Sequence, residues 1–244
     1  MKPFLLLATR AEDTAADEEY AAFARFGGLE PGQLQRVRLE AGPMPAIDLD
    51  DYSGIILGGS PYTSSDDDAF KSAAQLRVEA ELEQLLDTVV ARDFPFLGAC
   101  YGVGTLGRYG GGVVDRQYGE PIGEAHIVLT DDGAADPLLA GLPREFGAFV
   151  GHKEACSVLP AGAVRLAGSA HCPNQMFRLQ ENLYATQFHA ELDVDGLLTR
   201  IWIYRDAGYF PPDQADAVME RVRGRTVTIP QRILRNFVAR YATD

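Results

Sequence analysis

Residues 96–102 read FLGACYG, a short apolar run that leads into a G-x-C-x-G motif centred on Cys100. Such a run predicts a buried strand, and the residues after Cys100 predict a helix. A cysteine on a sharp turn from strand to helix has a strained backbone and projects clear of the sheet, and small neighbours let the two elements pass closely. The helix N-terminus also lowers the thiol pKa. The motif therefore predicts a nucleophile, with an inert buried cysteine as the alternative.

Strand and helix patterns alternate on the N-terminal side of this motif. A continuous apolar run of strand length lies at residues 4–8, a weak strand pattern at 37–39 and a stronger one at 55–57. Two helical patterns lie at residues 17–26 and from the N-cap candidates at 64–68 to about 91. This alternation predicts an α/β protein with a parallel sheet.

The pattern changes after residue 113. Short strand-like runs separated by Gly, Pro and Asp turns lie at 125–129, 148–150, 164–167 and 183–187. Helical patterns return at 192–207, 213–223 and 230–240. Short strands in this part of the chain predict an antiparallel extension of the sheet. Because no repeat or long linker interrupts the chain, we expect a single domain over residues 1–244.

A thiol nucleophile needs a base, and the chain has four histidines. His189 ends the last strand-like run, and Glu191 follows two residues later. A strand end places a side chain at the carboxyl edge of the sheet, where the elbow also opens. A carboxylate bonded to the second ring nitrogen would fix the tautomer and stabilise the imidazolium. We therefore predict His189 as the base and Glu191 as its orienting group; an unrelated surface pair is the alternative.

The other histidines give weaker indications. His152 follows a strand-like run and either lines the pocket, where it could bind a substrate carboxylate, or has a structural or surface role. His126 lies within a strand-like run, so core packing is its default. The pair His171-Cys172 and the spacing from His152 to Cys156 are metal-like, but neither forms a recognisable set with a second pair. No metal site is predicted.

A glycine-rich turn, Gly58-Gly59-Ser60-Pro61, follows the strand-like run at 55–57. Its ordinary interpretation is a simple turn. Its functional interpretation is an oxyanion hole, because the Gly59 amide can approach a carbonyl oxygen with no side chain in the way. A second amide would come from Tyr101, the residue after the nucleophile.

Composition excludes several classes of partner. The formal net charge is -13, which disfavours nucleic acid and anionic membranes. Three cysteines without a CxxC spacing do not form a disulfide framework and favour a reducing compartment. The N-terminal apolar run is too short for a signal peptide, and no window approaches the roughly 20 apolar residues of a membrane span. We expect a soluble, cytoplasmic protein.

Together these motifs resemble the class I glutamine amidotransferases, especially GMP synthetase-like amidotransferase domains that occur as separate proteins. Gly58-Gly59-Ser60-Pro61 resembles the family's oxyanion loop, residues 98–102 its nucleophile elbow, and residues 187–191 (QFHAE) its Q-F-H-P-E motif. Residues 151–154 and 172–177 resemble the substrate-side segments of that subgroup. Three motifs in order are specific, because chance matches multiply.

The resemblance implies a flavodoxin-like, doubly wound sheet and hydrolysis of the glutamine side-chain amide without a cofactor. It implies that the Cys100 thiolate attacks the amide carbon while the Gly59 and Tyr101 amides hold the oxyanion. His189 would protonate the departing ammonia, and water would then release glutamate from a γ-glutamyl thioester. No synthetase domain fits in this chain, so we expect any enzyme that accepts the ammonia to be a separate protein.

Two departures from the family pattern leave the substrate open. The family usually has Gln where this chain has Gly104, and that Gln helps to bind glutamine; Ala190 replaces the usual Pro. The first change could weaken glutamine binding or admit a larger γ-glutamyl compound. The alternatives are therefore a γ-glutamyl hydrolase or peptidase with the same triad, and a catalytically silent binding module.

Overall fold

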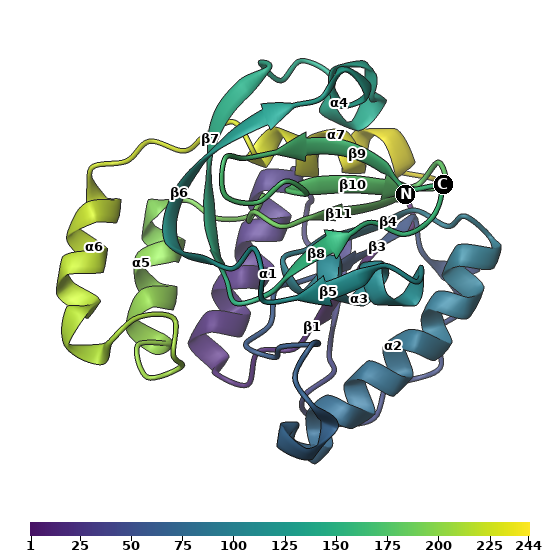
Figure 1. Cartoon of the computed structure of the whole chain (residues 1–244). Helices are drawn as coiled ribbons and strands as arrows, with labels where there is room; N and C mark the ends of the chain where they lie inside the picture. Colours follow the sequence, from purple (N-terminus) through teal and green to yellow (C-terminus); the bar gives the residue numbers. More distant parts are fainter.

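The structure is a computed structural model that describes residues 1–244 (Figure 1). Its centre is a nine-stranded sheet in the order β2-β1-β3-β4-β11-β10-β9-β6-β7. The first five strands in this order are parallel. They are β2 (Leu34–Arg38), β1 (Phe4–Ala8), β3 (Gly54–Leu57), β4 (Phe96–Ala99) and β11 (Leu183–Thr186).

The rest of the sheet is the antiparallel extension. It consists of β10 (Met176–Leu179), β9 (Val164–Gly168), β6 (Glu120–Leu129) and β7 (Glu145–His152). A separate two-stranded ribbon pairs β5 (Val113–Asp115) with β8 (Ala155–Val158). The predicted fold class is confirmed, although β5, β8 and β10 were not among the predicted strands.

Helices cover both faces of the sheet (Figure 1). Alternate residues of β1 point to opposite sides, so Phe4 packs with Phe23 and Phe237 while Leu5 packs with Val78. The first face is covered by α1 (Asp13–Gly27) and α7 (Gln231–Tyr241), and the second by α2 (Ala73–Ala91) and α3 (Tyr101–Tyr109). A smaller apolar cluster joins α5 (Val194–Ile203) and α6 (Ala215–Arg223) to β7. A short helix, α4 (Asp131–Ala135), follows β6.

Two local predictions were wrong. The helix expected to start within residues 64–68 starts at Ala73 instead, where the Ser72 side chain accepts a hydrogen bond from the Gln75 amide. His126 was expected in the core, but it is exposed and hydrogen bonded to Glu145. In β6 the alternate residues Ala125, Ile127 and Leu129 face the core, so His126 must face outward.

The parallel strands bring four chain segments to one edge of the sheet. Arg10 follows β1, Gly58 and Gly59 follow β3, Cys100 follows β4, and Gln187 follows β11. The carboxyl ends of adjacent parallel strands meet at the same edge, which is where α/β proteins build their sites. Separately, none of the helices combines the length and the apolar character that crossing a lipid bilayer requires.

Candidate active site

Cys100 occupies a strained bend between β4 and α3. Its backbone has φ 54° and ψ −80°, a left-handed conformation that side chains other than glycine rarely adopt. The Cys100 amide donates to the Thr186 carbonyl at 2.7 Å, which ties the bend to β11. A Cβ on Gly98 would lie 2.6 Å from the Gly102 Cα, so only glycine lets strand and helix pass here. The predicted elbow geometry is confirmed.

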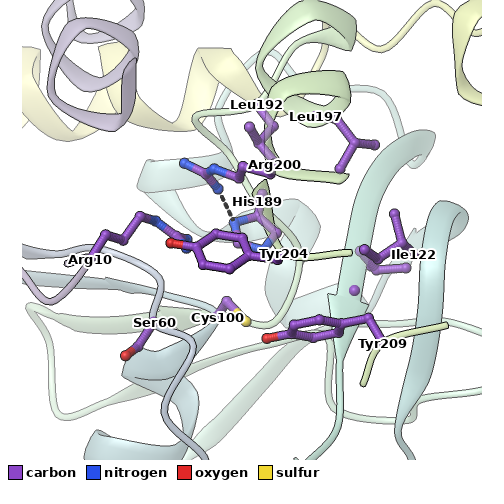
Figure 2. Close-up of a pocket in the computed structure, with 12 residues that line it drawn as sticks. Arg10, Ser60, Cys100, Ile122, His189, Leu192, Leu197, Arg200, Tyr204 and Tyr209 are labelled. Carbon is purple, nitrogen blue, oxygen red and sulfur yellow. Dashed lines mark hydrogen bonds between the residues drawn. The ribbon is translucent and has the colours of Figure 1, made fainter. Parts of the chain in front are cut away.

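His189 lies three residues after the end of β11 and faces the same cavity as Cys100 (Figure 2). Its amide donates to the Phe149 carbonyl of β7 at 2.9 Å, which fixes the backbone. Its Nδ1 lies 2.7 Å from Oε1 of Glu191, and Glu191 is fully buried. Because Nδ1 is engaged, Nε2 is the ring nitrogen available for proton transfer. The structure thus brings together all three residues predicted to act as nucleophile, base and orienting group.

A buried row of charges that no sequence pattern indicated lies behind the imidazole. Arg200 donates to Glu191 at 2.8 Å and to Glu19 at 3.3 Å. Arg10 donates through Nε to the same Glu19 oxygen at 2.9 Å. All four side chains are nearly inaccessible to solvent. The only signal that could have indicated one of them is the position of Arg10 directly after the first parallel strand.

The glycine turn packs against this row. A Cβ on Gly58 would lie 2.6 Å from Oε2 of Glu19, and one on Gly59 would lie 2.7 Å from a terminal nitrogen of Arg10. At either position a side chain would therefore displace one of these buried charged groups. The Gly59 amide has no hydrogen-bond partner in the protein. Tyr101 is the first residue of α3, so its amide has no partner within the helix. The two amides predicted to form the oxyanion hole are thus available.

Ser60 also lines the cavity, and its hydroxyl accepts a hydrogen bond from the Tyr62 amide at 3.0 Å. Gln187 lies near the nucleophile, with its Nε2 4.0 Å from the Cys100 sulfur.

Burial is the largest single influence on the pKa values of Cys100, His189 and Glu191. It raises the pKa of the Cys100 thiol to about 12, and Arg10 opposes this only in part. Burial also lowers the pKa of His189, although Glu191 acts in the opposite direction. Burial would raise the pKa of Glu191, but His189 and Arg200 outweigh it and hold that pKa well below its usual range. The resting pair is therefore a neutral thiol and a neutral imidazole, and the low thiol pKa expected at the helix N-terminus does not hold in the closed cavity.

Side chains from other segments occupy the space beside Gly104. A Cβ at this position would lie 2.5 Å from Oγ of Ser64 and 2.9 Å from Oε1 of Glu154. Glu154 is held there by the Ser64 hydroxyl and by the amides of Ser64 and Ser65, at 2.7 to 2.9 Å. The space into which a longer residue 104 would project is thus occupied by a carboxylate from a distant part of the chain.

His152 does not line the cavity. It is buried, with Nδ1 2.9 Å from the Glu154 carbonyl oxygen and Nε2 2.9 Å from a Glu120 carboxylate oxygen. Possible ligand atoms of Glu120, His152 and Cys172 lie within 4.8 Å of one another, which is the closest approach to a metal-binding set. Gln175 also donates to Glu120, at 2.5 Å, so hydrogen bonds account for this arrangement. His171 is exposed.

Residues 204–209, which follow α5, cover one side of the cavity. Tyr204 and Tyr209 both line it (Figure 2), and Lys153 donates to the Ala207 carbonyl between them at 2.6 Å. The Tyr204 hydroxyl donates to Glu12 at 2.8 Å. The cavity measures about 40 Å³, which is room for a water molecule but not for a glutamine side chain. Part of its lining must therefore shift when a substrate binds.

Comparison with known proteins places this geometry in a family. The family model described as glutamine amidotransferase class-I matches residues 33–195. The chain belongs to the class I glutamine amidotransferase family. Membership makes it, by class, a cysteine-dependent glutamine-hydrolysing enzyme, as the resemblance of its motifs predicted.

Relatives and solved structures agree with this membership. A GMP synthase [glutamine-hydrolyzing] of Porphyromonas gingivalis is 34% identical over 146 residues, covering 59% of this chain and 26% of that protein. The corresponding protein of Bacillus subtilis is 32% identical over 140 residues, covering 57% and 24%. The match thus spans about a quarter of these relatives.

Two solved structures share the fold across nearly the whole chain. A glutamine amidotransferase of Thermotoga maritima has a TM-score of 0.77 at 21% identity, covering 99% of this chain and 98% of that one. A glutamine amido transferase of Methylobacillus flagellatus has a TM-score of 0.71 at 20% identity, covering 100% and 97%. At these identities the likeness concerns the fold alone.

Proposed function

We propose that this amidotransferase hydrolyses the side-chain amide of glutamine through Cys100, His189 and Glu191. The observation that carries the proposal is the cavity shared by Cys100, at its strained bend, and His189, whose Nδ1 is held by Glu191. A nucleophile beside a base that is itself oriented by a third group is the arrangement used for acyl transfer.

The proposed reaction begins from the neutral pair. His189 Nε2 takes the thiol proton as the Cys100 sulfur attacks the amide carbon, and the Gly59 and Tyr101 amides receive the oxyanion. The tetrahedral intermediate then breaks its C–N bond, and His189 returns the proton to the departing ammonia. A γ-glutamyl thioester remains on the sulfur. Water attacks the thioester carbon, His189 accepts a proton from that water, and glutamate leaves as the thiol is restored.

The fate of the ammonia is a separate part of the proposal. Two relatives are named GMP synthase [glutamine-hydrolyzing], and this chain matches about a quarter of each. We propose that a separate synthetase or ligase is a candidate acceptor of ammonia from this chain. A pull-down with such a ligase, and ammonia transfer in the presence of glutamine, would test this part on its own.

A γ-glutamyl hydrolase is the second candidate, and the packing at Gly104 favours it. Glu154 and Ser64 occupy the space beside that glycine, where the family's usual Gln would extend. The donor that such a Gln would provide to free glutamine is therefore missing from this chain. The same three residues would then cleave a γ-glutamyl bond to a larger amine.

Release of glutamate and ammonia from glutamine tests the proposal, alongside a panel of γ-glutamyl peptides and amines. Cys100→Ala should abolish turnover, while Cys156→Ala, a matched change at a buried cysteine outside the cavity, should retain it. An electrophilic analogue of glutamine should label Cys100 alone. Turnover by the Cys100→Ala variant would exclude the proposed nucleophile. No turnover of any compound together with no labelling would favour a silent binding module.

A further inference from the structure

A second cavity, here called the α1/α7 cleft, lies where the end of α1 meets the start of α7. It measures about 470 Å³, which is within the usual range of about 300–1,000 Å³ for pockets that hold small organic ligands. None of its residues lines the cavity that contains Cys100. The polar residues that line it are Arg25, Asp193, Thr228, Gln231, Arg232 and Arg235.

The lining of the α1/α7 cleft is basic, although the chain as a whole is acidic. Three guanidiniums and one carboxylate line it, in a chain whose formal net charge is -13. Arg25 and Asp193 form an ion pair at 2.5 Å, so they compensate one another. Arg232 donates to the Gly141 carbonyl, and Arg235 is exposed and forms no ion pair. The charges of Arg232 and Arg235 are therefore not compensated within the cleft.

The position of these two arginines opposes the local electrostatics of α7. Both lie in the first two turns of the helix, where the N-terminus already has a positive potential, and the first turn contains no acidic residue. Cations normally stabilise the other end of a helix, so Arg232 and Arg235 weaken α7 unless an anion lies beside them. Local choices that conflict with the fold are expected at functional sites. A helix N-terminus with two free guanidiniums is suited to binding an anion.

One buried group of the α1/α7 cleft lacks a hydrogen-bond partner. Gln231 is 8% exposed, and its Nε2 donates to the Leu192 and Val227 carbonyls at 2.5 and 3.2 Å. Because both of these partners are acceptors, they fix which end of the amide is the nitrogen. The other end, Oε1, has no donor in the protein. A buried oxygen without a donor is destabilising, and a ligand that brings an N–H or O–H group into the cleft would supply one.

We propose that the α1/α7 cleft binds a small phosphate monoester that also carries a hydroxyl or amino group. Above a pH of about 6 a phosphate monoester approaches a charge of −2 and offers three acceptor oxygens. This charge matches the two uncompensated arginines, whose guanidiniums bind phosphate oxygens in pairs. The Thr228 hydroxyl is a further donor in the cleft. The hydroxyl or amino group of the ligand donates to Oε1 of Gln231, which a bare anion would leave unpaired.

Calorimetric titration of the wild-type protein tests this with ribose 5-phosphate, glucose 6-phosphate and AMP. Methyl phosphate keeps the anion without a further donor, while ribose, glucose and adenosine keep the donors without the phosphate. We expect at least one of the three monoesters to bind about tenfold or more tightly than methyl phosphate, as for one added hydrogen bond, and the three neutral compounds not to bind. Equal affinity for all the phosphates, or equally tight binding of the dicarboxylate succinate, would overturn the inference.

Variants then assign the binding to the α1/α7 cleft. Arg235→Gln removes an exposed guanidinium that forms no ion pair, so the protein should fold as the wild type does. It should weaken the tightest monoester by about tenfold or more, because a charge-assisted hydrogen bond is lost. Arg232→Gln should weaken the same ligand independently. Arg223→Gln, at an exposed arginine of α6 outside the cleft, is the matched control and should keep the wild-type affinity.

The remaining outcomes show whether the ligand binds elsewhere. Unchanged affinity in Arg235→Gln and Arg232→Gln would place the ligand outside the cleft and overturn the inference. An equal loss in Arg235→Gln and Arg223→Gln would also overturn it, because long-range attraction rather than a site would then hold the anion. Cys100→Ala should bind the monoester as tightly as the wild type, since the two cavities share no residue. Every readout is binding, so these outcomes leave the proposed thiol chemistry untouched.

Discussion

Gly104→Ala is the change whose outcome depends most directly on the packing around the cavity. Gly104 lies within α3, where glycine is less favourable than alanine by about 1 kcal/mol. Helix propensity alone therefore predicts that alanine stabilises the protein. The structure predicts the opposite, because the new methyl group would lie 2.5 Å from Oγ of Ser64 and 2.9 Å from Oε1 of Glu154.

The size of the effect follows from what has to move. The Ser64 hydroxyl must turn away and lose its 2.8 Å bond to the Glu154 carboxylate. A buried hydrogen bond to a charged group contributes about 1.5–3 kcal/mol, and the helix gains about 1 kcal/mol from alanine, so the net loss is about 0.5–2 kcal/mol. In a Ser64→Ala background that bond is already absent, so Gly104→Ala should cost distinctly less there.

Gly102→Ala is the matched control in the same helix. A Cβ on Gly102 would meet only Cδ2 of Leu57, at 3.9 Å. This variant should gain up to about 1 kcal/mol from helix propensity. Urea unfolding followed by circular dichroism gives the free energy of unfolding of wild type, both single variants and the Ser64→Ala pair. Equal stability of the two alanine variants, or a Gly104→Ala protein more stable than wild type, would refute the packing described for this site.

Three further predictions concern the charges and the cover of the cavity. The acid limb of kcat/KM against pH should lie below the ordinary histidine value of about 6.5, because burial lowers the pKa of His189 and activity is lost as His189 becomes protonated. Glu191→Gln removes the group that raises the His189 pKa, so the acid limb should move to still lower pH and kcat should fall. A wild-type acid limb above pH 6.5 would contradict the assignment of His189 as the base. Arg200→Met leaves two buried carboxylates without their shared cation and should lower the free energy of unfolding by about 3–5 kcal/mol in urea titrations. Lys153→Ala removes a bond that holds the cover, so iodoacetamide should label Cys100 several-fold faster, and an unchanged rate would show that the cover is held in another way.

The sequence predicts those features of the fold that depend on neighbouring residues. The apolar run at 4–8 corresponds to β1 residue for residue, because a strand buried on both faces needs an unbroken apolar run. The bend at Cys100 also follows from its neighbours, since Gly98 and Gly102 meet across it. Local chemistry therefore accounts for both the elbow and the parallel half of the sheet.

Features that depend on distant contacts could not be predicted. Residues 64–68 have good N-cap chemistry, but the amides of Ser64 and Ser65 are taken by Glu154, about ninety positions further along the chain, and Ser72 caps the helix instead. No local pattern indicated that Arg200 would bridge two carboxylates. The thiol pKa was expected to be low from the helix N-terminus, and it is raised because tertiary packing buries the sulfur.

The γ-glutamyl thioester on Cys100 is the intermediate that the proposed thiol chemistry requires. Acid quenching during turnover of glutamine or a γ-glutamyl peptide, followed by mass spectrometry of the intact protein and its peptides, would detect it. We expect a mass increase of one γ-glutamyl group on the peptide containing residue 100, lost in Cys100→Ala and kept in Cys156→Ala. Turnover without any acyl group on that peptide, or with the group attached elsewhere, would contradict it.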